Sequence, residues 1–168
     1  MRDLIRGLTE ADWPQVVDLE AGAYADTSLT EGEAGLRSRA AAGTCFVLDR
    51  DGRIAGYVLA LPYPRFHYPE PARAEQTAHR SANLHLHDLV VTAPLRRRGL
   101  GTHLVRHLTD VARGRGFETM SLIAVAGKEP FWRANGYRPH PEARLPAGYG
   151  SGAVYMSARL VALREASS

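Results

Sequence analysis

The stretch from Asn83 to Gly101, NLHLHDLVVTAPLRRRGLG, determines how the rest of the sequence is interpreted. Its first half is an apolar, β-branched run that carries two histidines one residue apart, His85 and His87, and predicts a buried strand over Leu84–Val91. Its second half is a turn of three arginines and Gly-Leu-Gly. Apolar residues then recur with helical spacing and predict a helix over Leu100–Arg113. The stretch is therefore a strand–turn–helix unit.

The flanking sequence supplies the other elements of an α/β (α+β) domain. Asp51-Gly52 joins two apolar runs and is a strong hairpin signal. Further strands are expected over 3–6, 44–48, 53–61, 119–125 and 153–160, and further helices after Thr9, over 31–42 and over 129–135. This order, with helices early, a hairpin, and then alternating strands and helices, predicts a mixed sheet with helices on both faces.

The length and composition are typical of one domain spanning residues 1–168, with a tail after about residue 161 that is expected to fray. A net charge of +3 does not by itself indicate a nucleic-acid partner. The single cysteine, Cys45, excludes an internal disulfide and a cysteine-based zinc site, and its apolar setting favours a core residue. The sequence shows neither a signal peptide nor an apolar stretch that would span a membrane, so a cytoplasmic location is expected.

The arginine-glycine turn, residues 96–101, has the parts needed to hold a pyrophosphate. Glycine allows the backbone to approach a ligand closely, and the first turn of a helix presents unpaired N–H groups to an anion. Arginine side chains add charge-assisted donors. The segment matches neither the P-loop nor the dinucleotide-binding glycine pattern. A surface turn with solvated arginines is the alternative interpretation.

Residues 86–108, LHDLVVTAPLRRRGLGTHLVRHL, resemble the acetyl-CoA-binding core of the GNAT superfamily of N-acetyltransferases, whose signature is [QR]-x-x-G-x-[GA]. FWRANGY at 131–137 resembles the family's next block, F-Y-x-x-x-G-[FY]. The resemblance extends over most of the chain, with its specific motifs in about 84–137. It implies a GNAT-like fold with a mixed, mostly antiparallel sheet of about six or seven strands.

The resemblance also implies acetyl-CoA as co-substrate and no metal. The backbone of Arg97 to Thr102 would hold the pyrophosphate, and the strand Leu89–Val91 would pair with the pantetheine arm and polarise the thioester carbonyl. The implied cofactor-binding residues are Leu89, Val90, Val91, Arg96, Arg97, Arg98, Gly99, Leu100, Gly101, Thr102 and Trp132.

His85 and His87 are candidate catalytic residues. On a regular strand both side chains point to one face, and Asp88 points to the other. Packed or surface histidines and an H-x-H metal site lacking a third ligand are the alternatives. The pair falls where the arylalkylamine (serotonin) N-acetyltransferase branch of the superfamily carries its own H-L-H. That resemblance implies a base or proton relay beside the acceptor amine.

The sequence does not identify a single proton donor to the departing thiolate. Many GNAT enzymes place a tyrosine at the second aromatic of the F-Y block, but this chain has Trp132, whose indole cannot serve as an acid near neutral pH. Tyr149 and Tyr155 are the candidates from the C-terminal segment. Neither can be preferred from the sequence.

The acceptor is expected to be a primary amine on a small molecule. The aromatic and proline-rich segment 61–69 would form a stiff lip to the acceptor pocket, and Glu20 and Tyr24 would face the same region by the family resemblance. A protein N-terminal or lysine acetyltransferase, a non-catalytic CoA-binding module and a nucleic-acid binder using Arg96–Arg98 are the alternatives. Family members are often dimers, so a homodimer is a further option.

Overall fold

The computed structural model describes residues 3–24, 31–69, 79–96, 98–145 and 147–160. Arg97 and the tail after residue 160, both subjects of sequence-based expectations, lie outside these residues. The strands are β1 (Asp3–Gly7), β2 (Phe46–Arg50), β3 (Arg53–Pro62), β4 (Asn83–Val91), β5 (Thr119–Ala124), β6 (Arg138–His140) and β7 (Val154–Arg159). The helices are α1 (Trp13–Ala23), α2 (Gly32–Ser38), α3 (Leu100–Gly114) and α4 (Glu129–Ala134), with 3-10 turns at Glu10–Asp12, Ala93–Leu95 and Ala147–Tyr149.

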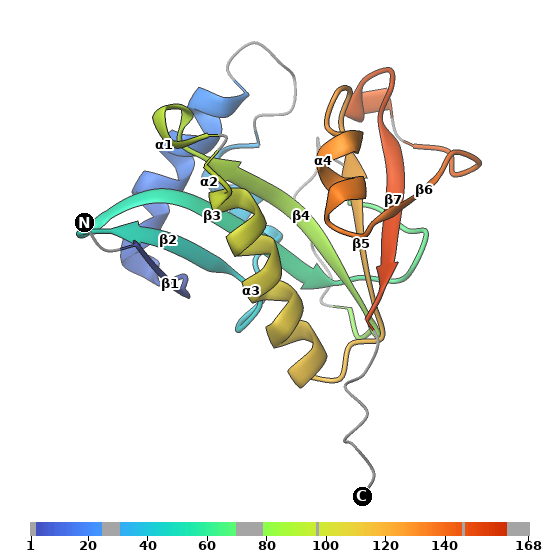
Figure 1. Cartoon of the computed structure of the whole chain (residues 1–168), viewed down its shortest axis with the longest axis horizontal. Coiled ribbons are helices and arrows are strands. Elements are labelled where there is room, and N and C mark those ends of the chain that lie inside the picture. The colour runs from blue at the N-terminus through green and yellow to red at the C-terminus, as the bar shows by residue number, and fades with distance from the viewer. Residues whose placement is uncertain (1–2, 25–30, 70–78, 97, 146, 161–168) are drawn as a thin grey trace, which may run out of the picture.

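The seven strands form one sheet in the order β1-β2-β3-β4-β5-β7-β6. Every neighbouring pair is antiparallel except β4 and β5, which are parallel because α3 connects them. The predicted fold, a mixed and mostly antiparallel sheet with helices on both faces, is confirmed (Figure 1). No helix in the described segments is long and apolar enough to cross a membrane.

The sheet separates two apolar cores. One core lies under α3 and α4 and includes Leu104 and Leu108 of α3, Leu84 and Leu86 of β4, and Trp132. The other lies under α1 and α2 and includes Val16, Leu36, Tyr57 and Val90. Cys45 belongs to this second core, and burial raises its pKa to about 11, as expected for a packed and unreactive thiol.

The parallel contact between β4 and β5 is short. It joins Asn83 to Thr119, Leu84 to Met120 and His85 to Ser121, and no further pair follows. Beyond His85 the two strands diverge, as the spread between them in Figure 1 shows. The backbone of β4 from Leu86 onward is therefore unpaired on the side that faces β5, within the described part of the chain.

Strand β4 also contains a bulge. Leu86 pairs with Ala60 of β3 and Asp88 pairs with Leu59, so His87 is an extra residue on β4. The alternation of side chains shifts by one residue at this point, because two residues of β4 oppose one position of β3. Leu86 and Leu89, three residues apart, consequently both face the core under α3.

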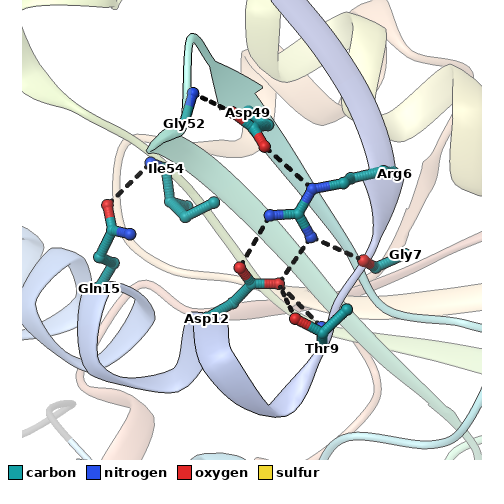
Figure 2. A network of polar contacts seen from close by, with 8 residues as sticks. All are labelled: Arg6, Gly7, Thr9, Asp12, Gln15, Asp49, Gly52 and Ile54. Carbon is teal, nitrogen blue, oxygen red and sulfur yellow. Dashed lines mark hydrogen bonds and ion pairs between the residues drawn. The ribbon is translucent and has the colours of Figure 1, made fainter.

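A polar network fixes the N-terminal edge of the sheet (Figure 2). The Arg6 guanidinium donates two hydrogen bonds to Asp12, each of 2.8 Å, and one of 3.0 Å to Asp49 of β2. The paired guanidinium lowers the pKa of the Asp12 carboxyl, which also accepts the Thr9 N–H at 2.8 Å. The network joins β1, the start of α1 and the β2–β3 hairpin, and so holds α1 against the sheet.

Among the differences from the sequence-based expectation, β2 starts and ends two residues later than predicted, one helix is shorter, and one strand was missed. The helix predicted over 31–42 ends at Ser38, because its backbone turns at Arg39 and continues through an Ala-Ala-Gly connection into β2. The strand β6 was not predicted, because three residues are too short to show a period of two.

Candidate active site

A cavity of about 700 Å³ opens between the diverging strands. Its walls come from the end of α1, the last six residues of β4, the first turn of α3, β5 and the start of α4. The lining includes Tyr24, Glu31, His87, Asp88, Gly99, Gly101, Thr102, Trp132 and Tyr149. The volume is in the range of pockets that bind small molecules and cofactors.

One end of the cavity is an anion cradle. Gly99 is the N-cap of α3 and has a φ of 77°, a left-handed conformation that strains any other residue. Leu100, Gly101 and Thr102 follow in the first turn, where N–H groups have no intrahelical acceptors. The Arg96 side chain donates to the Val91 carbonyl at 3.0 Å and lines the same wall. These groups fit a pyrophosphate, as the sequence predicts, whereas Arg98 is exposed and is not among the lining residues.

The β4 edge supplies a second part of the cradle. Leu89, Val90 and Val91 line the cavity along the unpaired side of β4. A ligand with amide groups can satisfy such an edge as an added strand would, so this position fits the pantetheine arm of CoA. The opposite wall includes Trp132, which is 7% exposed and packs edge-to-face against Phe131 and Tyr137.

His87 lines the same cavity. Its Nε2 contacts Oε2 of Glu31, the residue that precedes α2. The two side chains are only 4% and 7% exposed, so this contact is shielded from solvent. The Nδ1 atom of His87 is buried and has no hydrogen-bond partner among the described residues. An imidazole nitrogen in this state can accept a proton or a hydrogen bond from a ligand.

His85 has a different environment. It is buried, it does not line the cavity, and its Nδ1 lies 2.9 Å from Oγ of Ser121, where β4 and β5 still pair. Burial, reinforced by the nearby His87 and Arg39, lowers the pKa of His85 to about 3. Its catalytic role stays a prediction. The geometry gives His85 a packing position at the point where the strands diverge.

The expectation that Asp88 points away from the histidines is wrong. The bulge at His87 turns Asp88 toward α1, where it accepts hydrogen bonds from Tyr24 at 2.8 Å and from Tyr57 at 2.6 Å. Burial raises the pKa of the Asp88 carboxyl despite these two donors and the nearby His87. Asp88 therefore lies on the same side of the sheet as His87 and Glu31.

The two C-terminal tyrosines hold the segment that was expected to form the acceptor lip. The hydroxyl of Tyr155 accepts the Phe66 N–H at 3.0 Å, and the hydroxyl of Tyr149 donates to the Pro69 carbonyl at 2.6 Å. Tyr155 is buried and does not line the cavity, whereas Tyr149 does. Of the two tyrosines, only Tyr149 therefore lies where it can contact a ligand in the cavity.

Glu31 lines the cavity but was missed by the sequence analysis, as was Lys128. The position of Glu31 before a short helix gives no periodic signal, and its contact with His87 joins residues 56 positions apart. Tyr24 lines the cavity as expected, but Glu20 lies behind it and accepts the backbone N–H groups of Glu31 and Gly32, each at 3.0 Å.

The comparisons with known proteins agree with this geometry. The Acetyltransferase (GNAT) family model matches residues 6–137, so the chain belongs to the GNAT acetyltransferase family. Binding of acetyl-CoA is typical of this family, and the α3 cradle and the β4 edge fit it. No curated protein is significantly similar to the chain in sequence.

Several solved structures share the fold. The ribosomal-protein-S18-alanine N-acetyltransferase from Escherichia coli is 18% identical, with a TM-score of 0.70 and 98% coverage of both chains. Ard1 from Thermoplasma volcanium is 14% identical, with a TM-score of 0.71 and coverage of 96% of this chain and 99% of that one. The PaiA N-acetyltransferase from Thermoplasma acidophilum, in complex with coenzyme A, is 13% identical, with a TM-score of 0.68 and coverage of 95% and 99%.

Proposed function

We propose that this enzyme transfers the acetyl group of acetyl-CoA to a primary amine on a small molecule. The observation that carries the proposal is that one cavity joins the anion cradle at Gly99–Thr102 to the buried His87. A CoA thioester lying along β4 would extend from the cradle toward His87. An amine entering from the side of α1 and α2 would meet the thioester there.

His87 is the base in this proposal. An alkylammonium has a pKa of about 10.4 and is not nucleophilic until it loses a proton. In this proposal the proton goes to Nδ1 of His87, which has no hydrogen-bond partner among the described residues. The amine nitrogen then bonds to the thioester carbonyl carbon and gives up its second proton to solvent, the carbon–sulfur bond breaks, and CoA leaves as the thiolate with the sulfur electron pair. The product is an N-acetyl amide.

The acidic side chains near His87 support a cationic acceptor. Glu31 and Asp88 both line the cavity, and the carboxylates attract an ammonium group from solvent before it is deprotonated. Two histidines spaced as in the arylalkylamine N-acetyltransferase branch also favour an aryl or alkyl amine. In this chain only His87 of the two reaches the cavity.

Tyr149 is the proposed proton donor to the thiolate. Trp132 occupies the position where many family members carry tyrosine, and an indole N–H is not an acid near neutral pH. Tyr149 lines the same cavity and carries a hydroxyl. Its hydrogen bond to Pro69 would have to be exchanged for one to the sulfur.

A thiol-release assay with acetyl-CoA tests the proposal against its alternatives. The panel should contain aryl amines, alkyl amines, amino sugars, and peptides with free N-termini or lysines, with mass spectrometry of each product. Acetylation of a small amine with a higher kcat/KM than any peptide is the expected result. Preference for peptides would indicate a protein acetyltransferase, an activity carried by the structurally similar S18-alanine enzyme. Binding of acetyl-CoA without release of thiol across the panel would indicate a non-catalytic module.

A further inference from the structure

Glu31 occupies a fixed position between α1 and β4. Its backbone N–H and that of Gly32 donate to the two carboxylate oxygens of Glu20 on α1, each at 3.0 Å. Glu20 is 1% exposed, and burial raises the pKa of its carboxyl. Because both oxygens of this buried carboxyl accept backbone N–H groups, Glu20 holds the chain in place. In this case it holds the residue whose side chain reaches His87.

The Glu31 side chain lies between two nitrogen-bearing groups. Its Oε1 is 3.5 Å from Nε of Arg39, whose side chain is 1% exposed, and its Oε2 contacts Nε2 of His87. Arginine is always charged in proteins, so the carboxylate form of Glu31 is balanced from one side by the guanidinium. A carboxylate can only accept hydrogen bonds, so Nε2 of a neutral His87 must be the donor.

This contact decides which nitrogen of His87 carries the proton. A neutral imidazole has one N–H, and if that hydrogen is on Nε2 the lone pair is on Nδ1. Nδ1 is the atom without a partner among the described residues, in a side chain that lines the cavity. His87 is the unmatched residue of the β4 bulge, opposite Leu59 and Ala60.

We propose that Glu31 is a positioning residue that holds His87 in the Nε2–H form and so leaves the Nδ1 lone pair available for the proton of the acceptor amine. This inference rests on the proposed function. When His87 takes the proton, the charge that develops on the imidazolium lies beside the Glu31 carboxylate and is stabilised by it. Glu31 itself does not touch the reacting atoms.

Other ionisable groups also face this part of the molecule and contribute to its pH dependence. They are His85 and Asp88 on β4, Tyr57 on β3, Glu20 and Tyr24 on α1, and Arg39 after α2. Of these, only Arg39 contacts the Glu31 carboxylate as an ion pair within the described residues. Removing the Glu31 charge therefore changes the closest counter-charge of His87 and leaves the other groups in place.

The tautomer of His87 can be measured without turnover. Two-bond ¹⁵N–¹H NMR of the wild-type enzyme at neutral pH, with the His87 signal assigned by its loss in His87→Gln, distinguishes the Nε2–H form from the Nδ1–H form. The Nε2–H form is expected. Finding the Nδ1–H form would overturn the inference whether or not the enzyme acetylates an amine.

Kinetics of Glu31→Gln provide the second test. The glutamine keeps the shape of the side chain but loses its charge, so kcat should fall at least about tenfold, and the acidic limb of the kcat/KM profile should move to lower pH. The affinity for acetyl-CoA should not change. Glu33→Gln is the matched control, because Glu33 lies on α2 with a half-exposed side chain and does not line the cavity. It should keep wild-type kinetics.

The outcomes separate the two proposals. A wild-type enzyme that acetylates amines, together with Glu31→Gln that keeps the wild-type rate and pH profile, would refute the role of Glu31 and leave the function intact. A wild-type enzyme with no amine substrate but with His87 in the Nε2–H form would refute the function and leave the positioning contact intact. If Glu31→Gln fails to fold, the tautomer measurement on the wild type still decides the inference.

Discussion

Two histidines on one strand have opposite properties in this enzyme. His85 is buried where β4 pairs with β5, and His87 lies beside a carboxylate where the strands have parted. A histidine with a pKa of about 3 is neutral at every pH at which the enzyme would work and is a weak base toward an ammonium group. His87 is therefore the histidine of the pair that the proposed mechanism uses.

The neutral state of His85 predicts how stability depends on pH. The pKa of His85 is lowered from 6.5 in the unfolded chain to about 3 in the fold, so the unfolded state binds more protons between these values. Lowering the pH from 7 to 5 should therefore reduce the free energy of unfolding of the wild type by about 2 kcal/mol more than that of His85→Gln. Urea unfolding at the two pH values measures this difference. Equal losses in the two proteins would show that His85 is not held neutral.

The Asp88 carboxyl predicts a pH dependence of stability in the opposite direction. Its pKa is raised above the ordinary 3.8, so the folded state keeps this proton to a higher pH than the unfolded state does. The stabilisation that Asp88 contributes is fully present below pH 3.8, its pKa in the unfolded chain, and is lost as the pH rises through its folded-state pKa. Asp88→Asn lacks this loss, so its free energy of unfolding relative to the wild type should increase from about pH 4 to about pH 7. A difference that stays constant across this range would contradict the assignment.

The bulge shows where residue-level prediction from the sequence fails. The pattern of Leu84–Val91 predicts the strand, and a period of two assigns Asp88 to the face away from His87. One inserted residue reverses that assignment for Asp88 and every residue after it. Nothing in the local sequence marks the bulge, because it depends on the pairing with Leu59 and Ala60 of a distant strand.

At the scale of elements, the first turn of α3 is the feature that the sequence predicts best. Local residue preferences account for three features here: the left-handed glycine, the helix that follows it and the strand before it. The acceptor side is built differently. Glu20 on α1 holds Glu31, and Glu31 reaches β4, so three segments distant in sequence must assemble before the site exists.

A pair of glycines at the two ends of α3 tests the cradle. Gly99 and Gly116 both have left-handed φ values, 77° and 85°, and a Cβ on either would meet no protein atom within 4 Å. Gly99→Ala and Gly116→Ala should each lose about 1–2 kcal/mol of stability through backbone strain. Only Gly99→Ala should weaken acetyl-CoA binding, by at least about tenfold, because only that turn is the proposed site of the pyrophosphate.

Isothermal titration with acetyl-CoA measures the difference between these two variants. Gly116→Ala serves as the control for the loss of stability, since Gly116 follows the other end of α3 and is not among the residues that line the cavity. Equal dissociation constants for both variants and the wild type would exclude the Gly99 turn as the phosphate site.

At the scale of the whole molecule, the cavity exists because β4 and β5 diverge within one sheet. The sequence predicts the order of the elements and the family resemblance predicts the fold, and the family match over 6–137 confirms the family. The resemblance also places the CoA cradle, because the motif residues are contiguous. It does not place Glu31 or separate the roles of His85 and His87. Those depend on the length of the β4–β5 pairing and on side chains from α1 and α2.

The central claim is that one cavity brings the CoA thioester to His87. The most direct measurement is the single-turnover rate of acetyl transfer by His87→Gln, with the amine found for the wild type, together with its dissociation constant for acetyl-CoA. The rate should fall roughly 10²–10⁴-fold, the usual contribution of a positioned base. The dissociation constant should stay unchanged, because the cradle at Gly99–Thr102 is intact. A variant that transfers acetyl at the wild-type rate would contradict the account.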